Sequence, residues 1–275
     1  MTDRLSLRRS HAELVATIRA SEEWHPSYKA TPKQFRALVK TEAELQSEAG
    51  EYLYNLSQRA HLYVDWTEYA RELAKQPTVQ AACIHADAVA NAASDVWKGE
   101  ALDLQRHVIE AITLIMAIGV DAAIERYELP LYVDSVRDFV STAAQKHVAG
   151  LVSGVTETTR GKIRTSIQQS LTRGETTHQA MERIQETINN PVRAEMIAQT
   201  ESVNSWSMGI QNYGEATGAT SKTWEALAGA CTNKCGPTDG QVRKLNQPFK
   251  LADGTEVMYP AGHPRCRCGH YLSYE

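Results

Sequence analysis

The chain has 275 residues, of which 42% are hydrophobic and 23% are charged, and its formal net charge is −4. This composition is typical of a folded protein with room for two domains, and it excludes a polycation built to coat DNA. The first residues lack the continuous apolar segment of a signal peptide, and the most apolar run, residues 111–120, is shorter than the roughly 20 residues that a membrane span needs. We therefore expect a chain that is neither secreted nor inserted in a membrane.

The N-terminal part reads as helical. A short basic patch (Arg4, Arg8 and Arg9) precedes a helical pattern over residues 10–21, and we interpret the patch as a solvated terminus. Thr31-Pro32 then combines an N-cap residue with proline at the first helical position, which predicts the start of the next helix.

From residue 41 to residue 130 the pattern stays helical, and the short alternating runs that indicate strands are absent. Pro77 separates one helix from an alanine-rich helix over residues 79–97, in which Cys83 is interpreted as a small buried hydrophobic residue. The strongest helical pattern covers residues 102–124, where a broad apolar stripe recurs.

After a boundary at Leu129-Pro130, four more helices are predicted. They cover residues 133–150, a stretch that follows Thr158 and closes at Gly174, a stretch capped by Thr176 or Thr177, and a last helix that begins at Asn190-Pro191.

The last 60 residues change character. Residues 223–227 have the composition of a strand, and Asp239-Gly240 and Asp253-Gly254 are turn signals. Phe249 and Leu251 before the second turn, with Val257 and Tyr259 after it, predict a small hairpin.

The predicted fold is therefore mainly α. We expect a helical N-terminal region over residues 1–130. It is followed by a small α+β module over residues 131–275, whose segment 221–275 carries a structural zinc site.

Four of the five cysteines lie within this last segment. Cys231 and Cys235 are followed, after a gap, by His263, Cys266 and Cys268, which is the ligand layout of a closed zinc site. In a chain that is not secreted, clustered cysteines bind metal more often than they form disulfides. A segment with so few apolar residues also needs a metal to supply folding free energy.

Zinc takes four ligands, and five candidates are present. If residues 266–268 are extended, both sulfurs lie on one face and Arg267 on the other, so both cysteines can bind and His263 stays outside the ligand set. Alternatively, His263 and one of these two cysteines complete the tetrahedron. Because such a site is closed to water and no general base is evident beside it, we interpret the metal as structural and not catalytic.

A polar group precedes the cysteines on the last predicted helix. Gln199, Thr200, Glu201 and Asn204 share this helix, and Glu201 and Asn204 share a face because they are three residues apart. We interpret them as a buried hydrogen-bonded network that supports the module together with Trp224.

A larger set of residues joins these features into one pattern. It comprises Arg193-Ala-Glu-Met-Ile-Ala-x-Thr200-Glu201, Asn204, Gly209, Gly218, Lys222-x-Trp224, Cys231-x₃-Cys235, Asp239-Gly240, Pro248-Phe249 and His263-Pro-x-Cys266-Arg267-Cys268. Over residues 148–275 this pattern closely resembles the phage Mu F-like minor head (head morphogenesis) proteins. The chain departs from the family at Gln199, where arginine is usual, and in the three residues between Cys231 and Cys235, where two are usual.

The resemblance implies a virion component inside the phage head, and not an enzyme. It implies a role in procapsid assembly with the portal protein and with inner capsid or scaffold proteins, in the host cytoplasm, and for some members ejection with the DNA. We expect residues 1–130 to dock on the portal or inner capsid. Contact with packaged DNA is expected to be weak, because residues 221–275 carry seven basic against five acidic side chains.

Two other functions fit the cysteine cluster less well. A metal-dependent phage nuclease needs an exposed metal, for example between His263 or His270 and Glu256 or Asp239. A zinc-clamped DNA-binding module without catalysis needs more positive charge than the segment carries.

Overall fold

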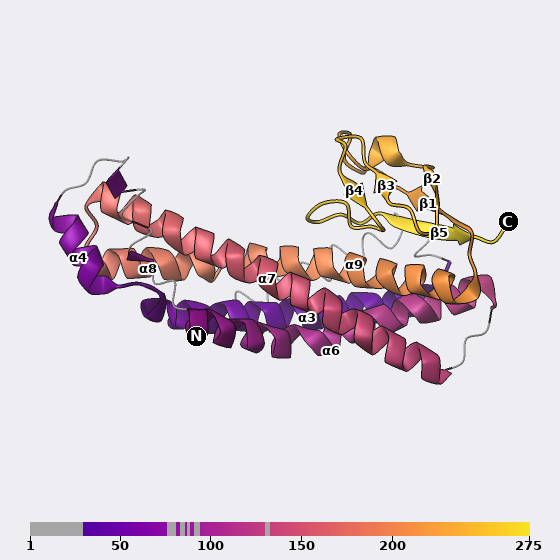
Figure 1. Ribbon diagram of the computed structural model, residues 1–275, viewed down its shortest axis with the longest axis horizontal. Coiled ribbons are helices and arrows are strands. Elements are labelled where there is room, and N and C mark those ends of the chain that lie inside the picture. The colour runs from indigo at the N-terminus through magenta and orange to yellow at the C-terminus, as the bar shows by residue number, and fades with distance from the viewer. Residues whose placement is uncertain (1–29, 76–80, 83–85, 87–88, 91–93, 130–132) are drawn as a thin grey trace. The chain divides into compact units, whose positions relative to one another are not determined.

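The computed structural model describes residues 30–75, 81–82, 86, 89–90, 94–129 and 133–275. Its helices are α3 (Pro32–Gln58), α4 (Trp66–Ala74), α6 (Ser94–Tyr127), α7 (Val133–Arg173), α8 (Thr177–Ile188) and α9 (Pro191–Thr217), with short 3₁₀ turns η1 (Ala60–Tyr63) and η2 (Gly236–Thr238). The strands are β1 (Ser221–Glu225), β2 (Val242–Lys244), β3 (Phe249–Lys250), β4 (Glu256–Val257) and β5 (Gly269–Ser273) (Figure 1). The predicted mainly helical fold with a small C-terminal sheet region is confirmed. The basic patch, the helix over residues 10–21, and Cys83 lie outside the described residues.

Local sequence signals set several helix ends as predicted. Thr176 caps α8, because its side chain accepts a hydrogen bond from the Gln179 amide while the Gln179 side chain accepts one from the Thr176 amide. Pro191 is the first residue of α9. Gly174 and Gly218 follow the ends of α7 and α9 with positive φ angles of 68° and 79°, a conformation that glycine adopts without strain.

The predicted break between residues 150 and 158 is wrong, because α7 runs without interruption over 41 residues. Its buried stripe continues through the region at spacings of three and four, with Val148, Val152, Val155, Thr159 and Ile163. Glycine in a helix interior costs only about 1 kcal/mol relative to alanine, so this packing outweighs Gly150 and Gly154.

The strands form two small antiparallel sheets. The first has the order β2-β1-β5, and the second pairs β3 with β4 through Phe249 opposite Val257. The hairpin predicted at the Asp253-Gly254 turn is therefore confirmed, as is the strand that carries Trp224.

The described residues form two compact units, and each combines segments from both sides of residue 130. Counting only the described residues, the first unit holds residues 30–47, 108–129, 133–147 and 192–275, and the second holds residues 48–75, 81–82, 86, 89–90, 94–107 and 148–191. The predicted domain division at residue 130 stays a prediction.

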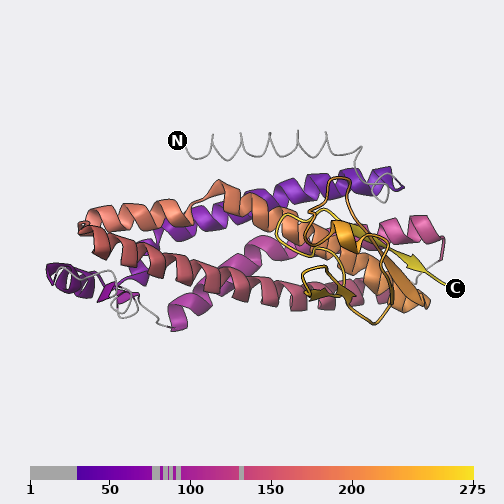
Figure 2. The same ribbon diagram turned by 90° about the horizontal axis from the view of Figure 1, so that it is seen from above.

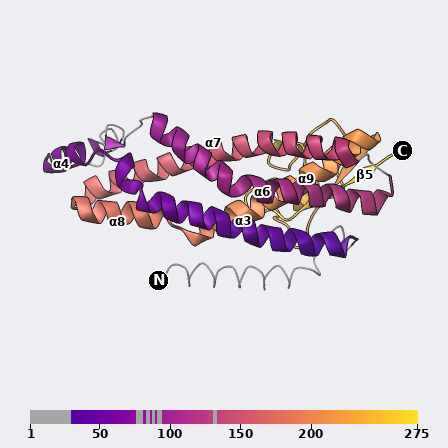
Figure 3. The ribbon, with the colours of Figure 1, turned by 90° about the horizontal axis from the view of Figure 1, so that it is seen from below.

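The first unit is built around α9. Gly119 on α6 and Gly209 on α9 let the two helices approach closely, since a Cβ atom on Gly209 would lie 2.3 Å from the Met116 carbonyl oxygen. The strands lie over the C-terminal half of α9, where Gln211 donates a hydrogen bond of 2.9 Å to the Leu245 carbonyl (Figure 2). Seen from the side away from the strands, α3 and the C-terminal half of α6 lie side by side (Figure 3), and the Gln34 amide donates to Glu125 there.

The second unit is held by partly buried polar pairs. Arg59 donates to both carboxylate oxygens of Glu100 at 2.9 and 2.8 Å and also reaches Asp103 at 3.0 Å. The Tyr69 hydroxyl donates to the Glu175 carbonyl, and the Glu175 carboxylate pairs with Arg183.

One helix corrects the expectation about membrane spans. Residues Val96–Tyr127 of α6 are long and apolar enough to cross a membrane by length and composition, since the apolar character extends well beyond residues 111–120. Of its most apolar 18-residue window, 56% is buried inside the protein. A core helix of a folded helical bundle has the same length, composition and burial.

Candidate metal centre

The five predicted ligands come together beside the aromatic core of the C-terminal sheets. They form two overlapping groups, Cys231–Cys235–His263 and Cys235–Cys266–Cys268, and within each group the ligand atoms lie within 4.8 Å of one another. Cys235 belongs to both groups. All four cysteines are free thiols, so the disulfide reading of this cluster is not supported.

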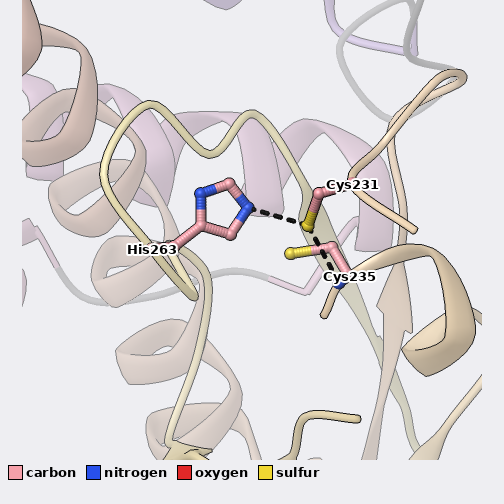
Figure 4. Close-up of side chains that lie close together, drawn as sticks. All are labelled: Cys231, Cys235 and His263. Carbon is pink, nitrogen blue, oxygen red and sulfur yellow. Dashed lines mark hydrogen bonds between the residues drawn. The ribbon is translucent and has the colours of Figure 1, made fainter. Parts of the chain in front are cut away.

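In the first group the imidazole and the two sulfurs face one another (Figure 4). The Nε2 atom of His263 lies 3.2 Å from the Cys231 sulfur, and the Nδ1 atom lies 2.8 Å from the Pro264 carbonyl oxygen. Since a carbonyl oxygen only accepts, Nδ1 carries the proton and the Nε2 lone pair points at the cluster. A backbone carbonyl that fixes the other nitrogen in this way is typical of histidines that bind metal.

The second group is buried. Cys235, Cys266 and Cys268 are 0%, 1% and 2% exposed, and the sulfurs of Cys235 and Cys266 lie 3.8 Å apart. Hydrogen bonding from the thiols of Cys235 and Cys268 lowers the pKa of Cys266, whereas hydrogen bonding to Cys266 raises the pKa of Cys235. The three buried thiols therefore compete, because ionisation of one makes ionisation of its neighbours harder. A bound cation that takes three thiolates would relieve this competition.

These distances fit a tetrahedral zinc ion. With Zn–S bonds of about 2.3 Å and Zn–N bonds of about 2.0 Å, the edges of the tetrahedron are about 3.8 Å between two sulfurs and about 3.5 Å between sulfur and nitrogen. The observed separations of 3.8 Å for Cys235–Cys266 and 3.2 Å for Cys231–His263 match this scale. The residues present therefore fit a metal, while the choice of four ligands among five stays a prediction.

The local backbone shapes the pocket. The Cys235 amide donates to the Cys231 sulfur at 3.3 Å, and the Gly236 amide donates to the Cys231 carbonyl at 2.9 Å, so residues 231–236 form a tight turn around one sulfur. Gly262 packs against the cluster, and a Cβ atom there would lie 2.8 Å from Leu251 and 3.6 Å from the Cys235 sulfur. A larger residue at this position would require the Leu251 side chain to move.

Helix α9 binds the metal loop (residues 261–268) through the polar residues that the sequence analysis identified on this helix. The Thr200 hydroxyl accepts a 3.1 Å hydrogen bond from the Arg265 amide, and the Gln199 side chain donates to the Arg265 carbonyl at 3.0 Å. Asn204 accepts a 2.8 Å hydrogen bond from the Ala261 amide. The predicted supporting network thus acts on the loop backbone, and Gln199 serves it in spite of the departure from the usual arginine.

Two partners of this network were missed by sequence reasoning. His147 on α7 lies 2.7 Å from the Glu201 carboxylate. Glu42 on α3 accepts two hydrogen bonds of 2.6 Å from the guanidinium group of Arg267. Neither lies near the cysteines in the sequence. Glu42 carried one signal, since it occupies a position on the buried side of α3, between Leu38 and Leu45.

The residues suggested for an exposed nuclease metal are used differently. His270 is 1% exposed, and burial lowers its pKa to about 3. The Asp239 carboxylate accepts a 2.8 Å hydrogen bond from the Ala226 amide. Among the described residues, the metal-binding groups identified are the two that contain cysteines.

Comparisons with known proteins agree with the residue pattern. Residues 161–271 match the model of a protein family described as phage Mu protein F like protein, and this range holds all five candidate ligands, Thr200, Glu201 and Trp224. Searches of curated proteins and of solved structures each found no match. Residues 161–271 therefore match the phage Mu protein F like family, which is the family that their motifs predicted.

Proposed function

We propose that this protein is a minor head protein of a phage, which acts in procapsid assembly together with the portal protein and is stabilised by one structural zinc ion. The family match over residues 161–271 is the observation that carries the proposal, since it indicates a phage head morphogenesis protein and hence a location in the virion. Assembly with the portal takes place in the host cytoplasm in this proposal.

The zinc assignment rests on the chemistry of the donors. Thiolates and imidazole are the ligands that zinc prefers, and cysteines closed off by Trp224 and Phe249 leave little room for the open position of a catalytic metal. Cys231 and Cys235 would hold the ion together with two of His263, Cys266 and Cys268. Bound zinc supplies folding free energy to a segment whose strands are only two to five residues long.

Metal content tests this part. We expect one zinc ion per chain in purified protein, and a Cys235→Ser variant that loses both the zinc and much of its thermal stability. A Cys83→Ser variant, which changes the one cysteine outside the cluster, serves as the control and should keep both. Substoichiometric zinc in the wild type, together with unchanged stability of Cys235→Ser, would refute the zinc assignment.

Association with the portal is tested separately. Co-expression of the tagged chain with the portal protein of the same phage should give a complex that survives size-exclusion chromatography, and mass spectrometry of intact virions should detect the chain. If the chain is absent from virions and does not co-purify with the portal, the assembly role is wrong. A cleavage assay on DNA with Mg²⁺ or Mn²⁺ checks the competing nuclease function, for which we expect no activity.

A further inference from the structure

Arg267 lies between two candidate ligands, Cys266 and Cys268, and its partner Glu42 comes from helix α3, far away in the sequence. We propose that Glu42 is a positioning residue of the metal centre and that metal binding and the anchoring of α3 stabilise each other. The inference rests on the proposed zinc site and adds to it a remote control of metal affinity.

Arg267 and Glu42 form a bidentate ion pair. Both guanidinium nitrogens of Arg267 lie 2.6 Å from the two oxygens of Glu42. The Glu42 side chain is 0% exposed and that of Arg267 is 18% exposed, so the pair is almost entirely withdrawn from water. A paired arrangement of this kind is directional, because the planar guanidinium matches the carboxylate in one orientation.

The pair acts on the cysteines through the backbone. The sulfurs of Cys266 and Cys268 join that of Cys235 in one group, while Arg267 between them reaches Glu42. This is the alternation expected of an extended chain, in which neighbouring side chains point to opposite faces. Fixing the guanidinium on one face therefore fixes the direction of both thiols on the other.

Other anchors of the metal loop act at a different place in the chain. Thr200 and Asn204 on α9 bind the loop backbone at Arg265 and Ala261. Both contacts lie before Cys266 in the chain. Glu42, in contrast, holds the side chain that lies between Cys266 and Cys268.

Coupling between two sites is reciprocal. If the packed position of α3 strengthens metal binding, bound metal stabilises the packed position of α3 by the same free energy. When the loop loses its ion, Cys266 and Cys268 lose their fixed position, and Arg267 between them is no longer held against Glu42. The Glu42 carboxylate is then left buried without its cation, which strongly disfavours the packed position of α3. The N-terminal half of α3 also buries Phe35, Leu38 and Leu45, so its release would expose apolar surface.

Zinc affinity of a charge-neutralising variant tests the first half of this coupling. In competition with a chromogenic chelator, Glu42→Gln should bind zinc roughly 10- to 100-fold more weakly than the wild type, the range typical of changes to groups that orient metal ligands. Glu44→Gln is the matched control, since Glu44 lies on the same helix with a side chain that is 53% exposed and pairs with Lys40 at 3.8 Å. It should bind zinc like the wild type.

Hydrogen exchange of the wild type tests the second half and needs no variant. Removal of zinc by chelation should speed exchange of the amides of residues 36–47 by roughly 100-fold or more, as expected for loss of one partner from a buried ion pair. Helix α8 belongs to the other compact unit and is the internal reference, which should change less.

The outcomes separate this inference from the proposed function. A wild type without zinc defeats the metal assignment itself. A wild type with zinc, in which Glu42→Gln has unchanged affinity or α3 exchange does not respond to chelation, overturns the coupling alone. If Glu42→Gln does not fold, the exchange experiment decides.

Discussion

The close approach of α6 and α9 makes Gly209 a sensitive position. A Cβ atom at residue 209 would lie 2.3 Å from the Met116 carbonyl oxygen and 3.1 Å from the Val120 amide nitrogen. Bringing the closest contact to 3.0 Å requires the helices to move apart by about 0.7 Å, because the obstructing atoms belong to the backbone and cannot rotate away. The opposite face of the contact is equally tight, since a Cβ atom on Gly119 would lie 2.4 Å from the Trp206 carbonyl oxygen.

We therefore expect Gly209→Ala to destabilise the protein. Overpacking costs about 1–3 kcal/mol, and a clash between backbones belongs at the upper end, while alanine recovers up to about 1 kcal/mol of helix propensity. The expected net loss is about 2 kcal/mol in urea denaturation of the metal-loaded protein.

Gly154→Ala in α7 is the matched control for this experiment. Gly154 is also a helix-interior glycine, but nothing lies within 4 Å of a Cβ atom there, so alanine should stabilise the protein by up to about 1 kcal/mol. If Gly209→Ala is as stable as Gly154→Ala, the reasoning about the helix contact is refuted.

Three further outcomes are expected. Burial lowers the pKa of His270 to about 3, so between about pH 6.5 and pH 3 the unfolded chain binds more protons than the folded one, and stability falls as the pH is lowered through this range. His270→Leu should lose less stability over this range. A stability difference between the variant and the wild type that does not change with pH would count against the buried neutral imidazole. Burial likewise lowers the pKa of Lys222 to about 8, so its contribution to stability rises with pH between about 8 and 10.5, and Lys222→Met should show a flatter profile in denaturation at these pH values. Asn204→Ala leaves the Ala261 amide without its acceptor and should cost about 1–3 kcal/mol in urea denaturation; a loss below a few tenths would mean that water replaces the side chain.

Several elements could be predicted because their signals are local. The capping box of Thr176 and Gln179 and the proline at residue 191 act within one helical turn, and the hairpin around Asp253-Gly254 needs only its own turn and its flanking apolar residues. The ligand cluster was also visible, since cysteine and histidine at these spacings serve few purposes other than metal binding.

The structure overturned a prediction where local and global preferences compete. One predicted helix ended at Gly150 and the next began after Thr158, yet α7 is continuous through this region. A glycine lowers helix stability by a small amount, whereas the stripe of buried residues from Val148 to Ile163 gains from packing that the sequence does not display.

By itself, the sequence determined the helical class, several helix ends, the C-terminal hairpin, the candidate ligands and the family that residues 161–271 match, because each depends on spacing within a short stretch of chain. Tertiary structure alone decided that Glu42 meets Arg267 and that His147 meets Glu201. It also decided that Gly119 and Gly209 lie at one helix contact. These pairs are far apart in the chain, and a side chain carries no mark of its distant partner until packing brings the two together.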